Sequence, residues 1–264
     1  GRRQMTATAT IHPTALVDPT ACLGADVEVG PFTIIGPNVA IADGCRIGAR
    51  VTLERNVRLG TRVQVGIGSV LGGEPQDLKY RGEETWVEVG PDTVIREYST
   101  INRGTTASGV TRVGARCFIM SYVHLAHDCH IGNGVIIANG TQLAGHVTVH
   151  DRATLSGLVA IHQFVTIGAL AFVGGCSRVN QDIPPYVKAV GNPVELYGLN
   201  TVGLQRAGMA EDTVRALKRL YRLFFNSDLN ISQAGERARV ELPVIDEVKM
   251  FLDFVERSNR GIPT

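Results

Sequence analysis

A short stretch in the middle of the chain carries residues that could move a proton. His127 and Asp128 are adjacent, and Gly145 and His146 stand eighteen residues further on. A histidine beside a carboxylate can act as a general base on a hydroxyl group when a donor stabilises the developing oxyanion. The Gly145 N–H could be that donor, since a residue without Cβ lets a substrate approach the backbone closely. Together with His162, three histidines could instead bind zinc, but Asp128 beside His127 favours proton transfer without a metal ion.

These residues are held by a six-residue repeat that runs through most of the chain. A branched aliphatic residue recurs at every sixth position from Ile11 to Leu71, and again from Val113 to Val179. This period fits neither a helix nor an ordinary strand. It predicts a mainly β solenoid, a parallel β-helix in which three repeats make one coil of about 18 residues. The glycine that often follows the aliphatic residue is expected to relieve the turn.

Residues eighteen positions apart should then stack about 4.8 Å from each other on neighbouring coils. By this rule the candidate residues share one corner of the solenoid over three coils. They are His127, Asp128, Gly145, His146, His162 and Gln163. Titratable groups that gather in this way favour a functional site over incidental surface histidines.

Two insertions interrupt the repeat, at about 72–86 and 103–112. The first places Asp77, Lys79 and Tyr80 within four residues, and we expect it to be functional because long loops in compact domains often are. The second is rich in Gly, Thr and Ser, and it could equally be a tolerated surface loop.

The segment after the last repeat is predicted to form a small helical domain. A first helix opens at Glu211, a short one follows Asn230, and a third starts at Pro243, a residue suited to the first helical position, and runs to about Ser258. The predicted organisation is a disordered or vector-derived N-terminus over 1–10, a β-helix over 11–196 and a C-terminal α-helical cap domain over 197–264.

Composition excludes several classes of function. Lys+Arg 26 against Asp+Glu 25 gives a net charge of +1, which is no signature of nucleic-acid binding. No stretch approaches the ~18 apolar residues of a membrane span and no signal peptide is recognised, so a cytoplasmic protein is expected. No P-loop or G-x-G-x-x-G lies between a strand and a helix, so ATP and NAD are not indicated. Cys45, Cys117 and Cys129 share one phase of the repeat and are expected to be small buried hydrophobes.

Several motifs carry a resemblance to a known family. They are Ile11-His12-Pro13-Thr14-Ala15, Gln76-Asp77-Leu78-Lys79-Tyr80, Ala126-His127-Asp128-Cys129, Leu143-Ala144-Gly145-His146-Val147, His162-Gln163-Phe164, Val173-Gly174-Gly175-Cys176-Ser177 and Gln181-Asp182-Ile183-Pro184-Pro185-Tyr186-Val187. With them the chain resembles the UDP-N-acetylglucosamine O-acyltransferases of lipid A biosynthesis. The resemblance implies a left-handed β-helix and a homotrimer with active sites between subunits. It also implies transfer of an (R)-3-hydroxyacyl chain from acyl carrier protein to the 3-hydroxyl of UDP-N-acetylglucosamine, with no cofactor beyond the phosphopantetheine of the donor.

The same resemblance implies roles for individual residues. His127 would be the general base, Asp128 would orient it, and the Gly145 N–H would stabilise the oxyanion. The residues implied in substrate binding are Gln76, Asp77, Lys79, His124, His146, His162, Gln163, Gly175, Asn200 and Arg206. Gly175 matches the position that sets acyl length. Val202 and Ala207 depart from the family pattern, which has an acidic residue and an arginine there.

Other functions stay open from the sequence. A UDP-glucosamine N-acyltransferase uses a similar solenoid but adds an N-terminal domain, for which a repeat starting at Ile11 leaves no room. A zinc-dependent, carbonic-anhydrase-like hydratase would use the histidines as metal ligands, and a non-catalytic β-helix would not use them. In the helical domain, a basic stripe at helical spacing could dock an acidic carrier protein or be a solvated helix face. It consists of Arg215, Lys218, Arg219 and Arg222.

Overall fold

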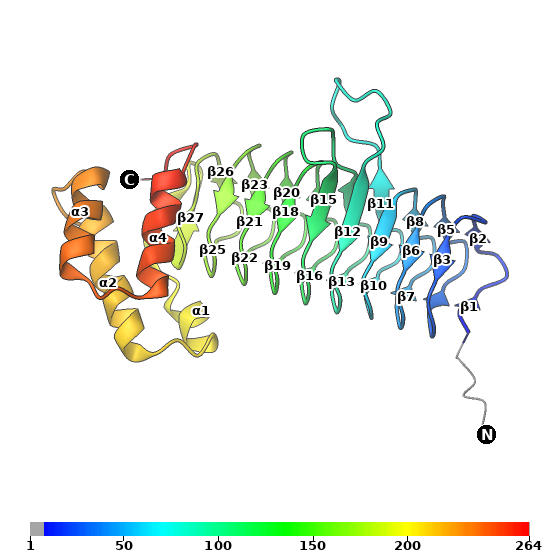
Figure 1. Ribbon diagram of the computed structural model, residues 1–264, viewed down its shortest axis with the longest axis horizontal. Helices are drawn as coiled ribbons and strands as arrows, with labels where there is room; N and C mark the ends of the chain where they lie inside the picture. Colours follow the sequence, from blue (N-terminus) through cyan, green and yellow to red (C-terminus); the bar gives the residue numbers. More distant parts are fainter. Residues whose placement is uncertain (1–7, 264) are drawn as a thin grey trace.

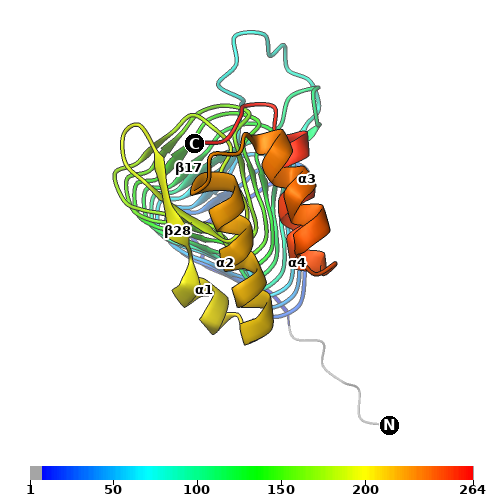
Figure 2. The same cartoon turned by 90° about the vertical axis from the view of Figure 1, so that its left-hand side faces the viewer.

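The chain folds into a long triangular solenoid with a small helical domain at one end (Figure 1). The computed structural model describes residues 8–263. Parallel sheets form the three sides of the solenoid, and Figure 2 shows the coils stacked behind one another. The prediction of a mainly β, left-handed parallel β-helix with a C-terminal helical region is confirmed.

Each coil contributes one short strand to each sheet. The first sheet consists of β1 (Thr10–Ile11), β4 (Glu28–Val29), β7 (Arg46–Ile47), β10 (Gln64–Val65), β13 (Val94–Ile95), β16 (Phe118–Ile119), β19 (Ile136–Ile137), β22 (Thr154–Leu155), β25 (Phe172–Val173), β27 (Val187–Val190) and β28 (Glu195–Leu199). The second consists of β2 (Leu16–Val17), β5 (Ile34–Ile35), β8 (Thr52–Leu53), β11 (Val70–Gly73), β14 (Thr100–Asn102), β17 (His124–Leu125), β20 (Gln142–Leu143), β23 (Ala160–Ile161) and β26 (Arg178–Val179). The third consists of β3 (Cys22–Leu23), β6 (Ala40–Ile41), β9 (Val57–Leu59), β12 (Trp86–Val89), β15 (Val110–Val113), β18 (His130–Ile131), β21 (Thr148–Val149) and β24 (Thr166–Ile167).

The register follows the eighteen-residue rule where no insertion intervenes. Leu125 pairs with Leu143, and Leu143 pairs with Ile161 on the next coil. From Val29 onward the aliphatic residues of the repeat point inward and are at most 3% exposed. Each buried side chain of this size contributes roughly 1.5–3 kcal/mol. The stack of inward aliphatics therefore holds together strands that are mostly only two residues long.

The glycines of the repeat serve a different purpose from the predicted one. They do not take the left-handed conformation, since positive φ falls two residues later, as at Asp26 (55°) and Asn38 (58°). At Gly36 a Cβ would lie 1.8 Å from the Glu54 carbonyl oxygen of the next coil. Glycine is needed there because neighbouring coils approach closely, and the prediction that it relieves the turn is wrong.

The two insertions project from one corner of the solenoid, at the top of Figure 1. Residues 74–85 connect β11 to β12, and residues 103–109 connect β14 to β15, so both cross from the second sheet to the third. Arg103 joins them. Its side chain is 1% exposed, and its guanidinium donates to the Gly72 carbonyl and to Tyr80 Oη (3.0 Å).

The helical domain contains α1 (Thr201–Arg206), α2 (Glu211–Phe225), α3 (Ile231–Glu241) and α4 (Asp246–Arg257). α2 begins at the predicted Glu211, and Asn230 caps α3. The third predicted helix is wrong at its start. Pro243 lies in a turn whose carbonyl accepts Ile245 N–H (3.0 Å), and the helix begins only at Asp246. Helix α1 and the antiparallel pair β27–β28 had no counterpart in the sequence prediction.

Residues 1–7 lie outside the described residues, so the predicted N-terminal segment over 1–10 can be seen only at its last three positions, where β1 begins. The predicted boundary between 196 and 197 falls inside β28. Among residues 8–263, no helix has the length and the apolar character needed to cross a membrane.

Candidate active site

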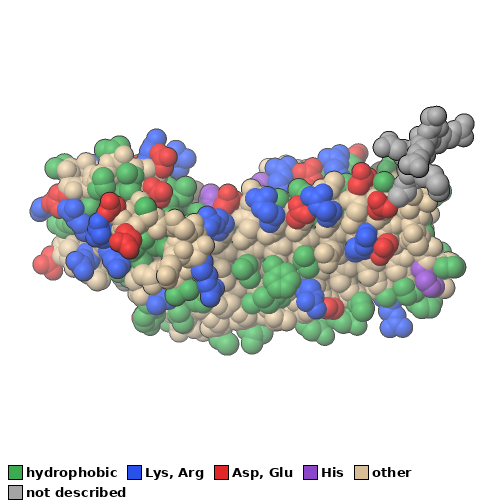
Figure 3. Space-filling view, turned by 90° about the horizontal axis from the view of Figure 1, so that it is seen from below, with side chains coloured by type: hydrophobic (Ala, Val, Ile, Leu, Met, Phe, Trp, Pro, Cys, Tyr) green, Lys and Arg blue, Asp and Glu red, His purple; other side chains and the backbone are tan. Residues whose placement is uncertain are grey.

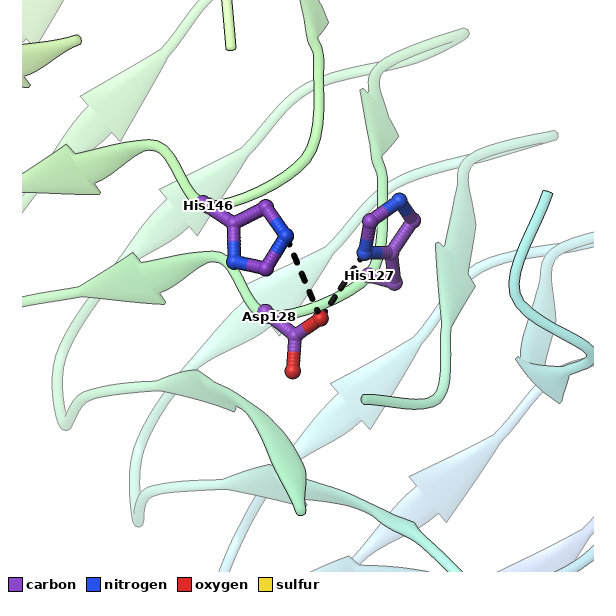
Figure 4. Close-up of side chains that lie close together, drawn as sticks. All are labelled: His127, Asp128 and His146. Atoms are coloured by element: carbon purple, nitrogen blue, oxygen red, sulfur yellow. Dashed lines mark hydrogen bonds and ion pairs between the residues drawn. The ribbon is translucent and has the colours of Figure 1, made fainter. Parts of the chain in front are cut away.

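The predicted cluster lies at the corner where the second sheet passes into the third. His127 and Asp128 follow β17, while Gly145 and His146 follow β20 one coil further along. The two turns touch, because His146 N–H donates to the His127 carbonyl (3.0 Å). Asp128 and His146 both take positive φ (60° and 61°), which turns their side chains toward the same place. Figure 4 shows His127 and His146 on either side of the Asp128 carboxylate.

The Asp128 carboxylate is buried and surrounded by donors. Its Oδ1 accepts Thr105 N–H (2.9 Å) and the Ser108 hydroxyl (2.5 Å). Its Oδ2 accepts the Thr105 hydroxyl (2.7 Å) and His127 Nδ1–H (2.8 Å). Burial alone would raise the pKa of the carboxyl group, but the bonds from Ser108, His127 and Thr105 outweigh it and lower the pKa of Asp128 to about 2. Asp128 is therefore ionised at neutral pH.

His127 is held between this carboxylate and Gly145. Because Nδ1 donates to Asp128, the neutral ring keeps its lone pair on Nε2. Within residues 8–263, Nε2 has no hydrogen-bond partner. A Cβ on Gly145 would lie 2.5 Å from Cε1 of His127, so only glycine leaves room for the ring. The Gly145 N–H donates to no described residue either, and both groups are free for a substrate.

His146 forms the second wall of the corner. Its ring stacks on Phe164 (centroids 4.4 Å apart) and meets the His127 ring edge-on (5.0 Å), and its Nε2 lies 3.8 Å from Asp128 Oδ2. Burial lowers the pKa of His146, although the charges of Asp128 and Asp77 oppose the shift. A neutral imidazole of this kind can donate a hydrogen bond to a thioester carbonyl, and it can donate to or accept from a sugar hydroxyl.

Three further predicted residues flank this corner. His124 lies on β17 with Nδ1 2.7 Å from the Thr100 hydroxyl, and burial lowers the pKa of its imidazole. His162 and Gln163 occupy the next turn beyond Gly145 and are exposed; His162 Nδ1 lies 3.1 Å from the Gln163 carbonyl oxygen. They extend the corner along the solenoid axis.

The first insertion carries Gln76, Asp77 and Lys79. Gln76 and Lys79 are exposed, and Asp77 is half-buried with Oδ1 accepting Lys79 N–H (2.9 Å). The charge of Asp77 acts on the pKa of His146, which indicates that the loop reaches the corner. Tyr80 anchors the loop through Arg103.

Other predicted residues lie elsewhere on the chain. Gly175 follows β25, at the corner between the first and second sheets. Asn200 caps α1 by accepting Gly203 N–H (3.1 Å) and donates to the Leu170 carbonyl (2.9 Å). Arg206 is exposed at the end of α1, and Figures 1 and 2 place α1 on the side opposite to the inserted loops. A single chain does not bring these residues to the corner of His127.

Sequence reasoning missed three residues of this site. Thr105 and Ser108 bind Asp128, and Phe164 stacks on His146. The Thr- and Ser-rich composition of the second insertion was the available signal for the first two. Phe164 stands eighteen residues after His146, so the stacking rule could have found it.

The same corner is the one place in residues 8–263 where three side chains could hold a metal ion. The ligand atoms of His127, Asp128 and His146 lie within 4.8 Å of one another. Each oxygen of Asp128 already accepts two hydrogen bonds, one of them from His127 Nδ1. The arrangement fits a histidine–aspartate pair for proton transfer better than a zinc site.

Cys129 is no nucleophile for this site. It is fully buried beside Asp128, and burial raises the pKa of its thiol to about 12. Cys45 and Cys117 are buried in the same way, which confirms their prediction as core residues. Cys129 therefore offers no reactive thiolate at this corner.

Two family models match the chain. Residues 111–145 match the bacterial transferase hexapeptide (six repeats), and residues 182–263 match domain 2 of UDP N-acetylglucosamine O-acyltransferase. The repeat, the histidine–aspartate pair and these matches define a hexapeptide-repeat acyltransferase.

Full-length relatives narrow the class to one family. An acyl-[acyl-carrier-protein]–UDP-N-acetylglucosamine O-acyltransferase of Syntrophobacter fumaroxidans is 47% identical over 96% of this chain and 98% of its own length. One from a Sulfurihydrogenibium species is 54% identical over 96% and 93%. A solved UDP-N-acetylglucosamine acyltransferase from Bacteroides fragilis matches with a TM-score of 0.95 at 39% identity, covering 97% of this chain and 100% of its own. The chain belongs to the acyl-[acyl-carrier-protein]–UDP-N-acetylglucosamine O-acyltransferase family, which supports O-acyl transfer over the N-acyltransferase, hydratase and non-catalytic alternatives.

Proposed function

We propose that this chain transfers an (R)-3-hydroxyacyl group from acyl carrier protein to the 3-hydroxyl of UDP-N-acetylglucosamine, the first step of lipid A biosynthesis. Donor and acceptor are those named for its relatives. One observation carries the mechanism: His127 Nδ1 donates over 2.8 Å to a buried carboxylate, which leaves Nε2 as a base facing away from it. Asp128 orients the ring and stabilises its protonated form during the reaction.

The proposed reaction has two steps. His127 Nε2 removes the proton of the sugar hydroxyl while the oxygen attacks the thioester carbonyl, and the Gly145 N–H donates to the oxyanion that forms. Collapse of the tetrahedral intermediate breaks the carbon–sulfur bond, and the thiolate of the phosphopantetheine arm takes the proton back from His127. The enzyme forms no covalent intermediate.

The surrounding side chains would bind the two substrates. Neutral His124 and His146 can hydrogen-bond to either the sugar or the pantetheine arm. The other proposed contacts are Gln76, Asp77, Lys79, His162, Gln163, Gly175, Asn200 and Arg206. The proposed reaction needs no metal and no cofactor, and it takes place in the cytoplasm. Metal analysis of active enzyme checks the first point, because zinc that is stoichiometric and required for turnover would contradict it.

The proposed assembly is a homotrimer with sites between subunits. The candidate residues lie on separate sides of one chain, so a second copy would supply the opposite wall. Exposed hydrophobic residues also follow the strands of the first sheet, at Phe32, Tyr98, Tyr122 and Leu158. Figure 3 shows hydrophobic side chains along one long edge of the solenoid. Such an apolar ridge is typical of an interface. Analytical ultracentrifugation tests this, and Tyr122→Glu should shift the trimer toward smaller species.

The basic stripe on α2 is the proposed docking surface for acyl carrier protein. Arg215, Lys218, Arg219 and Arg222 are all exposed. Arg215 pairs with Asp212 of the same helix, so the other three residues are the ones expected to meet an acidic partner.

The central test is His127→Ala. The variant should fold normally and lose at least about 1,000-fold in transfer from 3-hydroxyacyl carrier protein to UDP-N-acetylglucosamine, since it lacks its base. His12→Ala is the matched control, because His12 is an exposed histidine on the first coil and should keep full activity. Near-normal turnover in His127→Ala would refute the assignment of His127 as the general base.

A further inference from the structure

The second insertion closes over the acid of the proposed catalytic pair. Thr105 reaches both oxygens of Asp128, with its N–H to Oδ1 (2.9 Å) and its hydroxyl to Oδ2 (2.7 Å). Ser108 places its hydroxyl 2.5 Å from Oδ1. The carboxylate accepts four hydrogen bonds from Thr105, Ser108 and His127. Three of these four come from the loop residues Thr105 and Ser108.

The geometry of the hydroxyl groups fixes the direction of these bonds. Thr105 Oγ1 accepts Ala107 N–H (3.2 Å), so its single proton is free to point at Oδ2. The Ser108 hydroxyl lies within reach of the Val110 carbonyl (2.9 Å) as well as Oδ1. The shorter contact with a charged acceptor is the stronger one, so Ser108 donates to Asp128.

The loop itself is closed into a compact ring. Gly109 N–H donates to the Thr105 carbonyl (2.7 Å), and Trp86 N–H donates to the Gly109 carbonyl (2.9 Å). A Cβ on Gly104 would lie 2.4 Å from Val110 N, which shows how closely the two ends of the loop meet. The hydroxyl groups of Thr105 and Ser108 are thus held in place before any substrate arrives.

These bonds restrict the carboxylate in a way that matters for His127. A carboxylate with only one donor can rotate about its Cβ–Cγ bond and offer either oxygen. Here Oδ1 is occupied by two donors from the loop, and Oδ2 is left to be shared by Thr105 and His127. The imidazole is held in the tautomer that presents Nε2 to the substrate.

We propose that Thr105 and Ser108 are positioning residues, which hold the Asp128 carboxylate in the orientation from which Oδ2 accepts the hydrogen bond of His127 Nδ1. They act through Asp128 and touch no reacting atom. This inference rests on the proposed function, because it assigns the loop a part in the same proton transfer.

Thr105→Val and Ser108→Ala test the proposal, with Thr106→Val as a matched control. Thr106 is the next residue of the same loop and is exposed, and its side chain makes no hydrogen bond among residues 8–263. Each of the two test variants should lower kcat about 10-fold, as expected when one hydrogen bond to a charged group is lost, and leave both KM values within twofold. Thr105→Ser should restore most of the rate, and Thr106→Val should keep it.

A pH profile separates a role in orienting the Asp128 carboxylate from a role in keeping it ionised. The titratable groups that interact with the Asp128 carboxylate are His127, His146 and the Cys129 thiol. Removing one loop donor raises the pKa of Asp128 from about 2, but a rise of about one unit leaves the carboxyl group ionised at pH 5, so the deficit of Thr105→Val should be the same at pH 7.5 and at pH 5. In an Asp128→Asn background, Thr105→Val should lower kcat by less than twofold, because the negative charge that Thr105 binds is absent.

Several results would overturn the proposal. These are an equal loss in Thr106→Val, a deficit that grows as the pH falls from 7.5 to 5, an unchanged penalty in the Asp128→Asn background, or higher KM at constant kcat. Carboxyl-carbon NMR of Asp128 in the folded protein gives an assay that needs no turnover, and its pKa should rise in both variants. A wild-type enzyme that fails to acylate UDP-N-acetylglucosamine would refute the proposed function, while an unchanged Asp128 pKa in the variants would refute the role of the loop.

Discussion

Replacing Gly145 with alanine should abolish acyl transfer without unfolding the chain. A Cβ at this position would lie 2.5 Å from Cε1 and 2.7 Å from Nε2 of His127, where ordinary contacts are 3.4 Å or longer. The backbone is held on both sides. The Gly145 carbonyl accepts Phe164 N–H (3.1 Å), and His146 N–H donates to the His127 carbonyl (3.0 Å). The imidazole is therefore the part that must move, by about 1 Å.

A movement of this size is enough to stop catalysis. It stretches the 2.8 Å bond from His127 Nδ1 to Asp128 and displaces Nε2 from the substrate hydroxyl. Misplacing a catalytic group by about 1 Å can cost about 100-fold in rate. Overpacking by one methyl group lowers the free energy of unfolding by roughly 1–3 kcal/mol, which should leave a repeat protein of this length folded.

Gly157→Ala is the matched control for this experiment. Gly157 holds the same position in its hexapeptide, but a Cβ there would meet only the Asn139 carbonyl oxygen, at 3.3 Å. The assay is steady-state acyl transfer to UDP-N-acetylglucosamine, with circular dichroism melting for each variant. We expect Gly145→Ala to lose at least about 100-fold in kcat and Gly157→Ala less than threefold. The reasoning is refuted if Gly145→Ala keeps a third of the wild-type kcat, or if both variants lose equally.

Other expected outcomes follow from buried groups and from the surface of α2. Because the folded pKa of Asp128, about 2, is below its ordinary 3.8, the ionised form stabilises the fold by about 2 kcal/mol above pH 4, and this is lost as the pH falls through 2. Between pH 5 and 2, the free energy of unfolding measured in urea should therefore fall more for wild type than for Asp128→Asn. An equal fall in the two proteins would contradict the lowered pKa of Asp128. Arg103→Ala should lower the melting temperature and raise KM for UDP-N-acetylglucosamine, since Tyr80 loses its hydrogen bond to Arg103. An unchanged KM would show that Arg103 does not hold the first insertion in place for substrate binding. Cys129 should resist thiol reagents at pH 8 until the chain unfolds, because its thiol has a pKa of about 12, and mass spectrometry would detect early labelling. Arg222→Glu should raise KM for acyl carrier protein but not for the nucleotide sugar, a difference that high salt should erase.

The repeat made much of the fold predictable because residues on neighbouring coils pair at a fixed spacing of eighteen positions where no insertion intervenes. Once three hexapeptides close one coil, the residue eighteen positions after His127 has to stack on it, and Gly145 was located in this way. Local chemistry was less predictable. Pro243 predicts the start of a helix, yet it lies in a turn, and α4 begins only at Asp246. The glycines of the repeat read as turn residues, yet at Gly36 the requirement comes from the Glu54 carbonyl of the next coil.

The sequence by itself determined the solenoid, the corner that carries His127 and Asp128, and the presence of two insertions in the repeat. These depend on period and side-chain type, which a single chain displays directly. Only the tertiary structure decided that Thr105 and Ser108 bind the Asp128 carboxylate and that Asn200 and Arg206 lie on the opposite side. The conformation of an irregular loop depends on contacts between residues far apart in the chain, such as Trp86 with Gly109, and no local pattern encodes them.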